Sequence, residues 1–257
     1  MAGGWWRERT SWLVFAIVNS ISLALLFFDP KPHVFLVIVQ AIISLRIVFF
    51  IVHGSLSYHL RDLVVFTVIV VAISNFFENL SILTGFPFGE YYYTDGLGPK
   101  IFLVPIIITP AYLTTGYLSW VTAHMLFYTP ASAPSTPSVT AIPFIASILM
   151  VSWDLTMDPF MSTSSKFWVW KKGGSYFGVP FVNFLGWFLT VYLIFLCFAL
   201  YLRSQAHSNN EPNKSVSKSF WVVAIVSYMF IALQTLFDAA KRNPEKTFVD
   251  PTGAFSL

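Results

Sequence analysis

Two aspartates stand four residues apart in the segment WDLTMDP, at Asp154 and Asp158. On a helix, side chains at this spacing project from one face, and Pro159 directly after the pair indicates where the helix ends. Because like charges this close repel, one carboxyl group tends to keep its proton and can act as a general acid. Two other interpretations stay open: the pair holds Mg²⁺ against a substrate diphosphate, or it is a solvated pair at a helix end.

A third carboxylate, Glu78, belongs to a polar stripe in which Thr67, Ser74 and Ser81 recur at heptad spacing. Asn75 lies one turn before Glu78, so this helix face is expected to meet protein rather than lipid. The stripe fits hydrogen bonds that hold helices together. It also fits a carboxylic acid that burial keeps protonated and able to donate a proton.

The elements that position these carboxylates are expected to be membrane-spanning helices. The chain of 257 residues is 56% hydrophobic and only 11% charged, which is too much apolar surface for a water-soluble domain of this size. Stretches of about 18 residues with few charges can cross a hydrocarbon core roughly 30 Å thick. We therefore expect an all-α, multi-pass integral membrane protein, with residues 1–257 forming one domain of about seven transmembrane helices. The expected helices cover residues 11–28, 34–52, 63–84, 101–127, 139–157, 181–202 and 219–238.

Two connections between these helices, residues 85–100 and 158–180, mix Gly and Pro with aromatic and charged residues. Their places in the helix order put both at one membrane face, beside the carboxylates, so we expect the site there. Their carboxylates, Glu90 and Asp95, join Glu78, Asp154 and Asp158 as candidate catalytic residues. The candidate substrate-binding residues are Asn75, Tyr91, Tyr93, Trp153, Trp168, Trp170, Tyr176, Asn183 and Trp187. Such aromatic residues can form an interfacial belt, or their ring faces can stabilise a cation.

Several classes of function are disfavoured by the composition. The net charge of +3 comes without any long basic run, so nucleic acid is not an expected partner. The His residues do not pair with Cys or Glu at zinc-ligand spacing, and no nucleotide-binding loop is present. No cofactor is expected except Mg²⁺ under the alternative in which Asp154 and Asp158 bind metal. Membrane lipid is the expected surrounding, no obligate protein partner is evident, and Arg46 is expected to pair with an acid or to extend toward the interface.

Three stretches together carry a resemblance to a known family: FENLSILTGFPFGEYYYTDGLGPKIFLVPIIITPAY (77–112), WDLTMDPFM (153–161) and FWVWKKGGSYFGVPFVNFLGW (167–187). In their order and motifs they resemble the membrane carotenoid-biosynthesis family that includes carotenoid 1,2-hydratases and bisanhydrobacterioruberin hydratases. The resemblance implies a multi-helix lyase that adds water across a terminal double bond of an isoprenoid drawn from the bilayer. It implies no redox cofactor.

The residues suit that chemistry, because protonating a trisubstituted alkene gives a tertiary carbocation. Such a site needs a desolvated acid, aromatic walls and a controlled route for water. Glu78, Asp154 and Asp158 can supply the acid, and which of them donates the proton is left open. If water is excluded, an internal alkene captures the cation, and the enzyme is a terpene cyclase, an isomerase.

Two further functions stay open. In the first, Mg²⁺ helps to ionise a prenyl diphosphate in a cyclase or transferase. In the second, the protein is a non-enzymatic lipid transporter or binding protein, although no internal repeat between its halves supports this.

Overall fold

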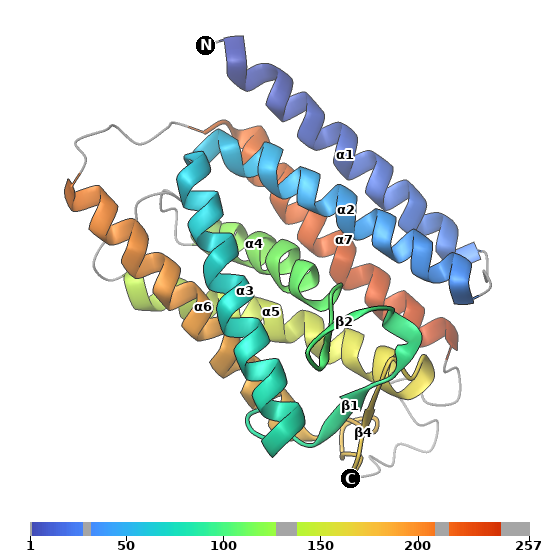
Figure 1. Ribbon diagram of the computed structural model, residues 1–257. Helices are drawn as coiled ribbons and strands as arrows, with labels where there is room; N and C mark the ends of the chain where they lie inside the picture. The colour runs from blue at the N-terminus through green and yellow to red at the C-terminus, as the bar shows by residue number, and fades with distance from the viewer. Residues whose placement is uncertain (1, 28–31, 127–137, 209–215, 243–257) are drawn as a thin grey trace.

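The computed structural model describes residues 2–27, 32–126, 138–208 and 216–242 (Figure 1). Helices dominate this part of the chain, which confirms the expected all-α class. They are α1 (Ala2–Phe27), α2 (Pro32–Ser57), α3 (Leu60–Thr84), α4 (Ile108–Leu126), α5 (Ser138–Asp158), α6 (Phe181–Ser208) and α7 (Lys218–Arg242). Residue 28, the last one of the first expected helix, lies outside the described residues.

Five helices of the described part, rather than the seven expected, are long and apolar enough to cross a membrane. These spans are Leu36–Ser57, Leu60–Thr84, Val139–Ser164, Phe181–Gln205 and Lys218–Phe237. The protein is therefore a multi-pass integral membrane protein, as expected. The expected number of spans is corrected, because α1 and α4 are not among the five.

Helix α4 explains one part of this correction. Every residue from Tyr112 to His124 is buried, and the helix contacts α2, α3, α5 and α7 (Figure 1). A helix that meets protein on its sides need not be apolar, so α4 can carry Thr and Tyr side chains that a lipid-facing span would exclude. It also begins at Ile108 rather than at residue 101, since the preceding residues form the antiparallel pair β2 (Lys100–Ile101) and β3 (Val104–Pro105).

The carboxyl end of α3 is fixed by a glycine. Gly85 adopts a left-handed backbone conformation with φ of 82°, and its N–H donates to the carbonyl of Ser81. Glycine reaches this conformation without a Cβ clash, which is why helices often end at such a residue. The chain then passes through β1 (Tyr91–Tyr93) and a short 3₁₀ turn, η1 (Asp95–Leu97).

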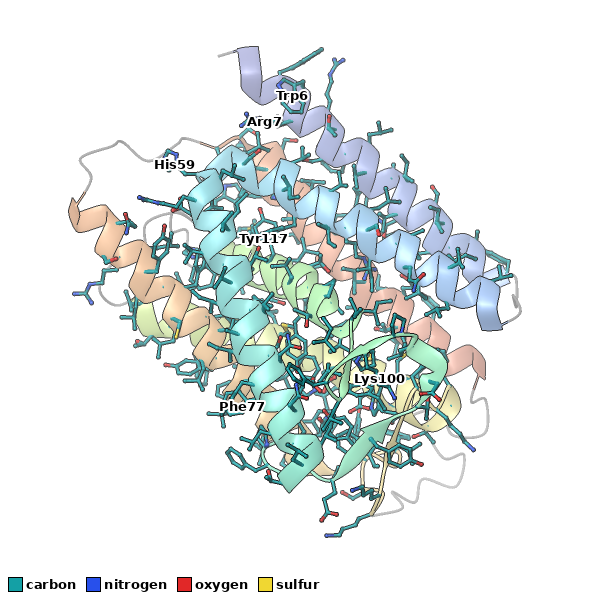
Figure 2. All side chains as sticks on the ribbon, in the orientation of Figure 1. Trp6, Arg7, His59, Phe77, Lys100 and Tyr117 are labelled. Carbon is teal, nitrogen blue, oxygen red and sulfur yellow. The ribbon has the colours of Figure 1, made fainter. Side chains whose placement is uncertain are left out.

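The second connection begins where α5 passes into a π-helical turn, η2 (Pro159–Ser164), and continues through β4 (Trp168–Trp170). Figure 1 shows β1, β2 and β4 together at one end of the helix bundle, away from the amino-terminal end of α1. Figure 2 places Lys100 at this end, and Trp6 and His59 at the other. The two connections expected to share a face therefore do so.

A separate hydrophobic cluster lies beneath these connections. It joins residues of the first connection to Trp170 and Val179 of the second and to Phe184 of α6. Because burial of large side chains is the main stabilising contribution in such a cluster, it fixes both connections against the helices. The site is built on this support.

Candidate active site

Strand pairing between β1 and β4 places four aromatic side chains together. Tyr91 lies opposite Trp170, and Tyr93 lies opposite Trp168, in an antiparallel pair. Successive side chains of a strand point to opposite faces, so these four residues share the inner face. Tyr92, between the two buried tyrosines, is 47% exposed.

Glu78 is buried near the end of α3 and accepts hydrogen bonds from three tyrosines. The hydroxyls of Tyr91 and Tyr93 donate to Oε2, the latter at 2.9 Å, and that of Tyr112 on α4 donates to Oε1 at 2.8 Å. Burial, and then the negative charge of Glu78, raise the pKa of Tyr91 and Tyr93 well above the ordinary range. The two phenols of β1 therefore remain protonated donors.

Asp154 and Asp158 are both buried and are joined by one amide. Nδ2 of Asn183, in the first turn of α6, donates to Oδ2 of Asp154 at 3.0 Å and to Oδ2 of Asp158 at 2.7 Å. Oδ1 of Asp158 accepts from the indole N–H groups of Trp168 at 2.8 Å and Trp170 at 3.4 Å. Asp158 is thus oriented by three N–H donors. Oδ1 of Asp154, by contrast, is buried without a hydrogen-bond partner among the described residues.

These groups surround a cavity of about 180 Å³. Glu78 and Asp158 both line it, whereas Asp154 is not a lining residue. Its aromatic walls are formed by Phe88, Tyr91, Tyr93, Tyr112, Trp153, Phe160, Trp168, Trp170 and Trp187. Carboxyl groups facing an aromatic space can donate and accept protons while ring faces stabilise a developing cation.

The structure brings most of the predicted site residues together. Those that line the cavity are Glu78, Tyr91, Tyr93, Trp153, Asp158, Trp168, Trp170, Asn183 and Trp187. Asp154 lies behind them and shares the amide of Asn183 with Asp158. Glu90 and Asp95 lie apart from this group. Glu90 pairs with Lys172 at 2.5 Å, and Asp95 with Lys100 at 3.2 Å, both on the exposed side of the connections.

Two predicted substrate-binding residues also lie outside the cavity lining. Asn75 donates to the side chain of Thr109 at 2.8 Å, a contact between α3 and the start of α4. The ring of Tyr176 packs edge-on against Phe184, with centroids 5.3 Å apart. In this arrangement both side chains support the packing around the site.

Tyr112 is a site residue that the sequence reasoning missed. It ends the stretch used for the family resemblance, and it lies in the second turn of α4 on the side of the connections. The sequence offered one signal for this residue, which is the position of a tyrosine soon after the first connection. For Arg46, the first of the two expected roles, pairing with an acid, is wrong, because it forms no ion pair with any residue that the structure describes. Its side chain lines the cavity.

The geometry gives no particular support to a metal centre. Within residues 2–27, 32–126, 138–208 and 216–242, no three His, Cys, Asp or Glu side chains gather as a metal-binding group. The oxygens of Asp158 receive N–H groups from Asn183, Trp168 and Trp170. Such donors compete with a cation for the same lone pairs.

Comparison with known proteins gives two matches and one absence. A family model described as "Carotenoid biosynthesis protein" matches residues 33–249. Bisanhydrobacterioruberin hydratase of Haloarcula japonica is 30% identical over 118 residues, which cover 44% of this chain and 36% of that protein. The match thus spans little more than a third of the relative's length. No solved structure matches the chain.

Proposed function

The chain belongs to the carotenoid biosynthesis protein family, and we propose that it is an enzyme that adds water to a double bond of a carotenoid-like isoprenoid. The observation that carries this proposal is the pair of carboxyl groups, Glu78 and Asp158, that face one aromatic cavity. The similarity to a hydratase favours water addition over cyclisation. Carotenoids dissolve in the bilayer, so a membrane-embedded cavity suits their entry.

Asp158 is the proton donor in this proposal. It lines the cavity, and Asp154 shares the amide of Asn183 with it from behind. Two adjacent buried carboxyl groups cannot both be charged at low cost, so the pair holds one proton between them. The three N–H donors to Asp158 aim this acid and stabilise the carboxylate it leaves.

The first chemical step transfers this proton to the less substituted carbon of the alkene. The π electrons form the new C–H bond and leave a tertiary carbocation, whose charge the ring faces of the cavity stabilise. Water then forms a C–O bond to the cationic carbon. Glu78, held by three phenols, is placed to take the proton that this water releases.

The net reaction is the addition of one water molecule to the double bond. The site resets when the proton gained by Glu78 is exchanged for the one lost by Asp158, so no electron donor or acceptor is needed. The two groups that transfer protons in this scheme, Asp158 and Glu78, are side chains that line the cavity.

A mass measurement tests this proposal. The purified protein is incubated in detergent or nanodiscs with two acyclic carotenoids, the hydrocarbon lycopene and one that bears a hydroxyl group, in water labelled with heavy oxygen. Uptake of one labelled oxygen, lost in Asp158→Asn and retained in Tyr92→Phe, supports hydration. An isomeric product of unchanged mass favours cyclisation, and release of diphosphate from a prenyl diphosphate supplied in place of the carotenoid favours the metal-dependent alternative. A panel of isoprenoids recovered unchanged favours a binding or transport protein.

A further inference from the structure

Arg46 lines the cavity that contains the carboxyl groups, but it belongs to a different part of the bundle. It is the only Lys, Arg, Asp or Glu residue within Pro32–Ser57, so α2 carries a single permanent charge. Leu36 of this helix lies near Gly98 of the connections, within reach of a Cβ there. Arg46 comes ten residues later, about 15 Å further from the connections at 1.5 Å per residue.

Its guanidinium lacks the partners that such a group normally has in a protein. Among the described residues it forms no hydrogen bond or ion pair, and its Nε is buried without an acceptor. Arg7 and Arg61 provide a contrast, since the first donates to the carbonyl of Ser55 and the second to the side chain of Gln205. A charged group left unpaired within a membrane span costs several kcal/mol and usually marks a functional position.

The nearby acids do not supply the missing partner. Glu78 accepts from three tyrosines, and Asp158 from two tryptophans and one asparagine. Neither carboxyl group is within ion-pair distance of Arg46 in the described part of the chain. Arg46 therefore does not neutralise Glu78 or Asp158 through a direct ion pair.

Two other lining residues carry buried polar atoms without partners. They are the indole Nε1 of Trp153 and the hydroxyl Oγ1 of Thr115. The N–H groups of arginine and tryptophan only donate, and the threonine hydroxyl donates or accepts. The group that completes these bonds must therefore contain an acceptor, and an oxygen atom is the acceptor that an isoprenoid can carry.

We propose that Arg46 binds an oxygen-bearing group of the isoprenoid, at a position remote from the double bond that the carboxyl groups attack. This inference rests on the proposed function for the reaction and deepens it by naming the substrate class, an oxygenated isoprenoid rather than a plain hydrocarbon. The oxygen is that of a hydroxyl or a phosphate ester, both of which accept hydrogen bonds from a guanidinium.

Such a contact fixes how far the chain enters the cavity. With the oxygen held by Arg46, only one stretch of the isoprenoid lies beside Asp158, so the arginine selects which double bond receives the proton. Orientation of this kind is a large part of catalysis in a site whose remaining contacts are apolar and non-directional.

Equilibrium binding tests the proposal without any need for turnover. The probes are geranylgeraniol, its phosphate ester, and the hydrocarbon of the same carbon skeleton, added to the protein in phosphatidylcholine nanodiscs. Binding is followed by tryptophan fluorescence, because Trp153, Trp168, Trp170 and Trp187 line the cavity. We expect at least one oxygenated probe to bind about tenfold more tightly than the hydrocarbon.

Arg46→Gln should remove this preference while the affinity for the hydrocarbon stays the same. Arg46→Lys, which keeps the charge, should retain part of it. Arg61→Gln is the matched control, since Arg61 is an exposed arginine of α3 that lies outside the cavity lining, and this variant should keep the full preference. A phosphate preferred over the alcohol identifies an anion as the ligand, and equal affinities identify a neutral oxygen.

Three outcomes overturn the proposal. They are no preference in the unaltered protein, an unchanged preference in Arg46→Gln, and abolition of the preference when phosphatidylglycerol replaces phosphatidylcholine, which would show that Arg46 binds the headgroup of an anionic lipid. Hydrocarbon binding in each variant verifies that the cavity is folded. Failure of the hydratase proposal is seen separately, as absent product formation with the binding preference intact.

Discussion

The ring of Tyr112 on α4 lies flat against the indole of Trp187 on α6, with centroids 4.3 Å apart and planes 2° apart. This stack holds the phenol so that its hydroxyl donates to Glu78 at 2.8 Å. The carboxyl group of α3 is thereby tied to two other helices through one side chain. Neither partner of the stack is close to the other in sequence, so the contact exists only in the folded bundle.

Removing the Tyr112 hydroxyl should weaken catalysis without disturbing the stack. Tyr112→Phe keeps the ring on Trp187 but removes one of three donors to Glu78, and we expect turnover to fall roughly tenfold. Tyr92→Phe is the control, because Tyr92 lies on the outer face of β1. Product formation and thermal unfolding are measured for both variants. Equal turnover in the two would show that the Tyr112 hydroxyl has no part in the reaction.

The aspartate pair should be far less tolerant of change. Asp158→Asn removes the proton donor but keeps a side chain of the same shape, and we expect turnover to fall roughly a hundredfold to ten-thousandfold. Asp154→Asn should also reduce turnover, but by a smaller factor, because of the two aspartates only Asp158 lines the cavity. Rates are measured at saturating substrate, and circular dichroism verifies the fold. Normal turnover in Asp158→Asn would move the proton donor elsewhere, to Glu78 in the first place.

The fold was predictable where long apolar stretches alone determine a helix. The stretch over 181–202 matches the span Phe181–Gln205, and the one over 219–238 matches the span Lys218–Phe237 to within one residue at each end. Helix α4 was predictable as a helix but not in its start, since residues 100–105 are apolar enough to continue a helix and instead form β2 and β3. Apolar composition does not distinguish a lipid-facing turn of helix from a short β-pair.

The site was predictable in its residue types and less so in its geometry. Aromatic runs such as YYY and WVW are typical of strands, in which side chains alternate between two faces, so Tyr91 and Tyr93 could have been placed on one face. The same alternation directs Glu90 outward with Tyr92, which the choice of Glu90 as a catalytic candidate ignored. The bridge from Asn183 to both aspartates depends on how α5 packs against α6, and no local pattern reveals such a contact.

Glu90 should therefore be dispensable. Glu90→Gln removes an exposed ion pair with Lys172, whose side chain is 79% exposed, and turnover should stay within about twofold because solvent screens such pairs. Lys172 lowers the pKa of Glu90. The pair thus adds stability above the ordinary pKa of glutamate and loses it as the pH falls through the lowered value.

The variant should lose that pH dependence and keep its activity. Unfolding is followed by a heat ramp across the acidic range, alongside turnover at neutral pH. Asp95→Asn, which breaks the exposed pair with Lys100, is a companion change that should likewise keep its activity. A loss of turnover comparable to that of Asp158→Asn would return Glu90 to the catalytic group.

Gly186 should be essential for docking the first connection onto α6. A Cβ at this position would lie 2.6 Å from the carbonyl oxygen of Pro87 and 2.8 Å from the ring of Phe88. Because the backbone oxygen cannot move without moving the connection, Gly186→Ala should destabilise the protein by about 1–3 kcal/mol. The displaced segment leads directly into β1, so turnover should fall as well.

Gly116→Ala is the matched control. The atom nearest to its added Cβ would be the sulfur of Met150 at 3.5 Å, an ordinary contact, and alanine favours a helix. Thermal unfolding in detergent compares the two variants. A Gly186→Ala protein as stable and active as Gly116→Ala would show that the connection does not rest on α6 at this point.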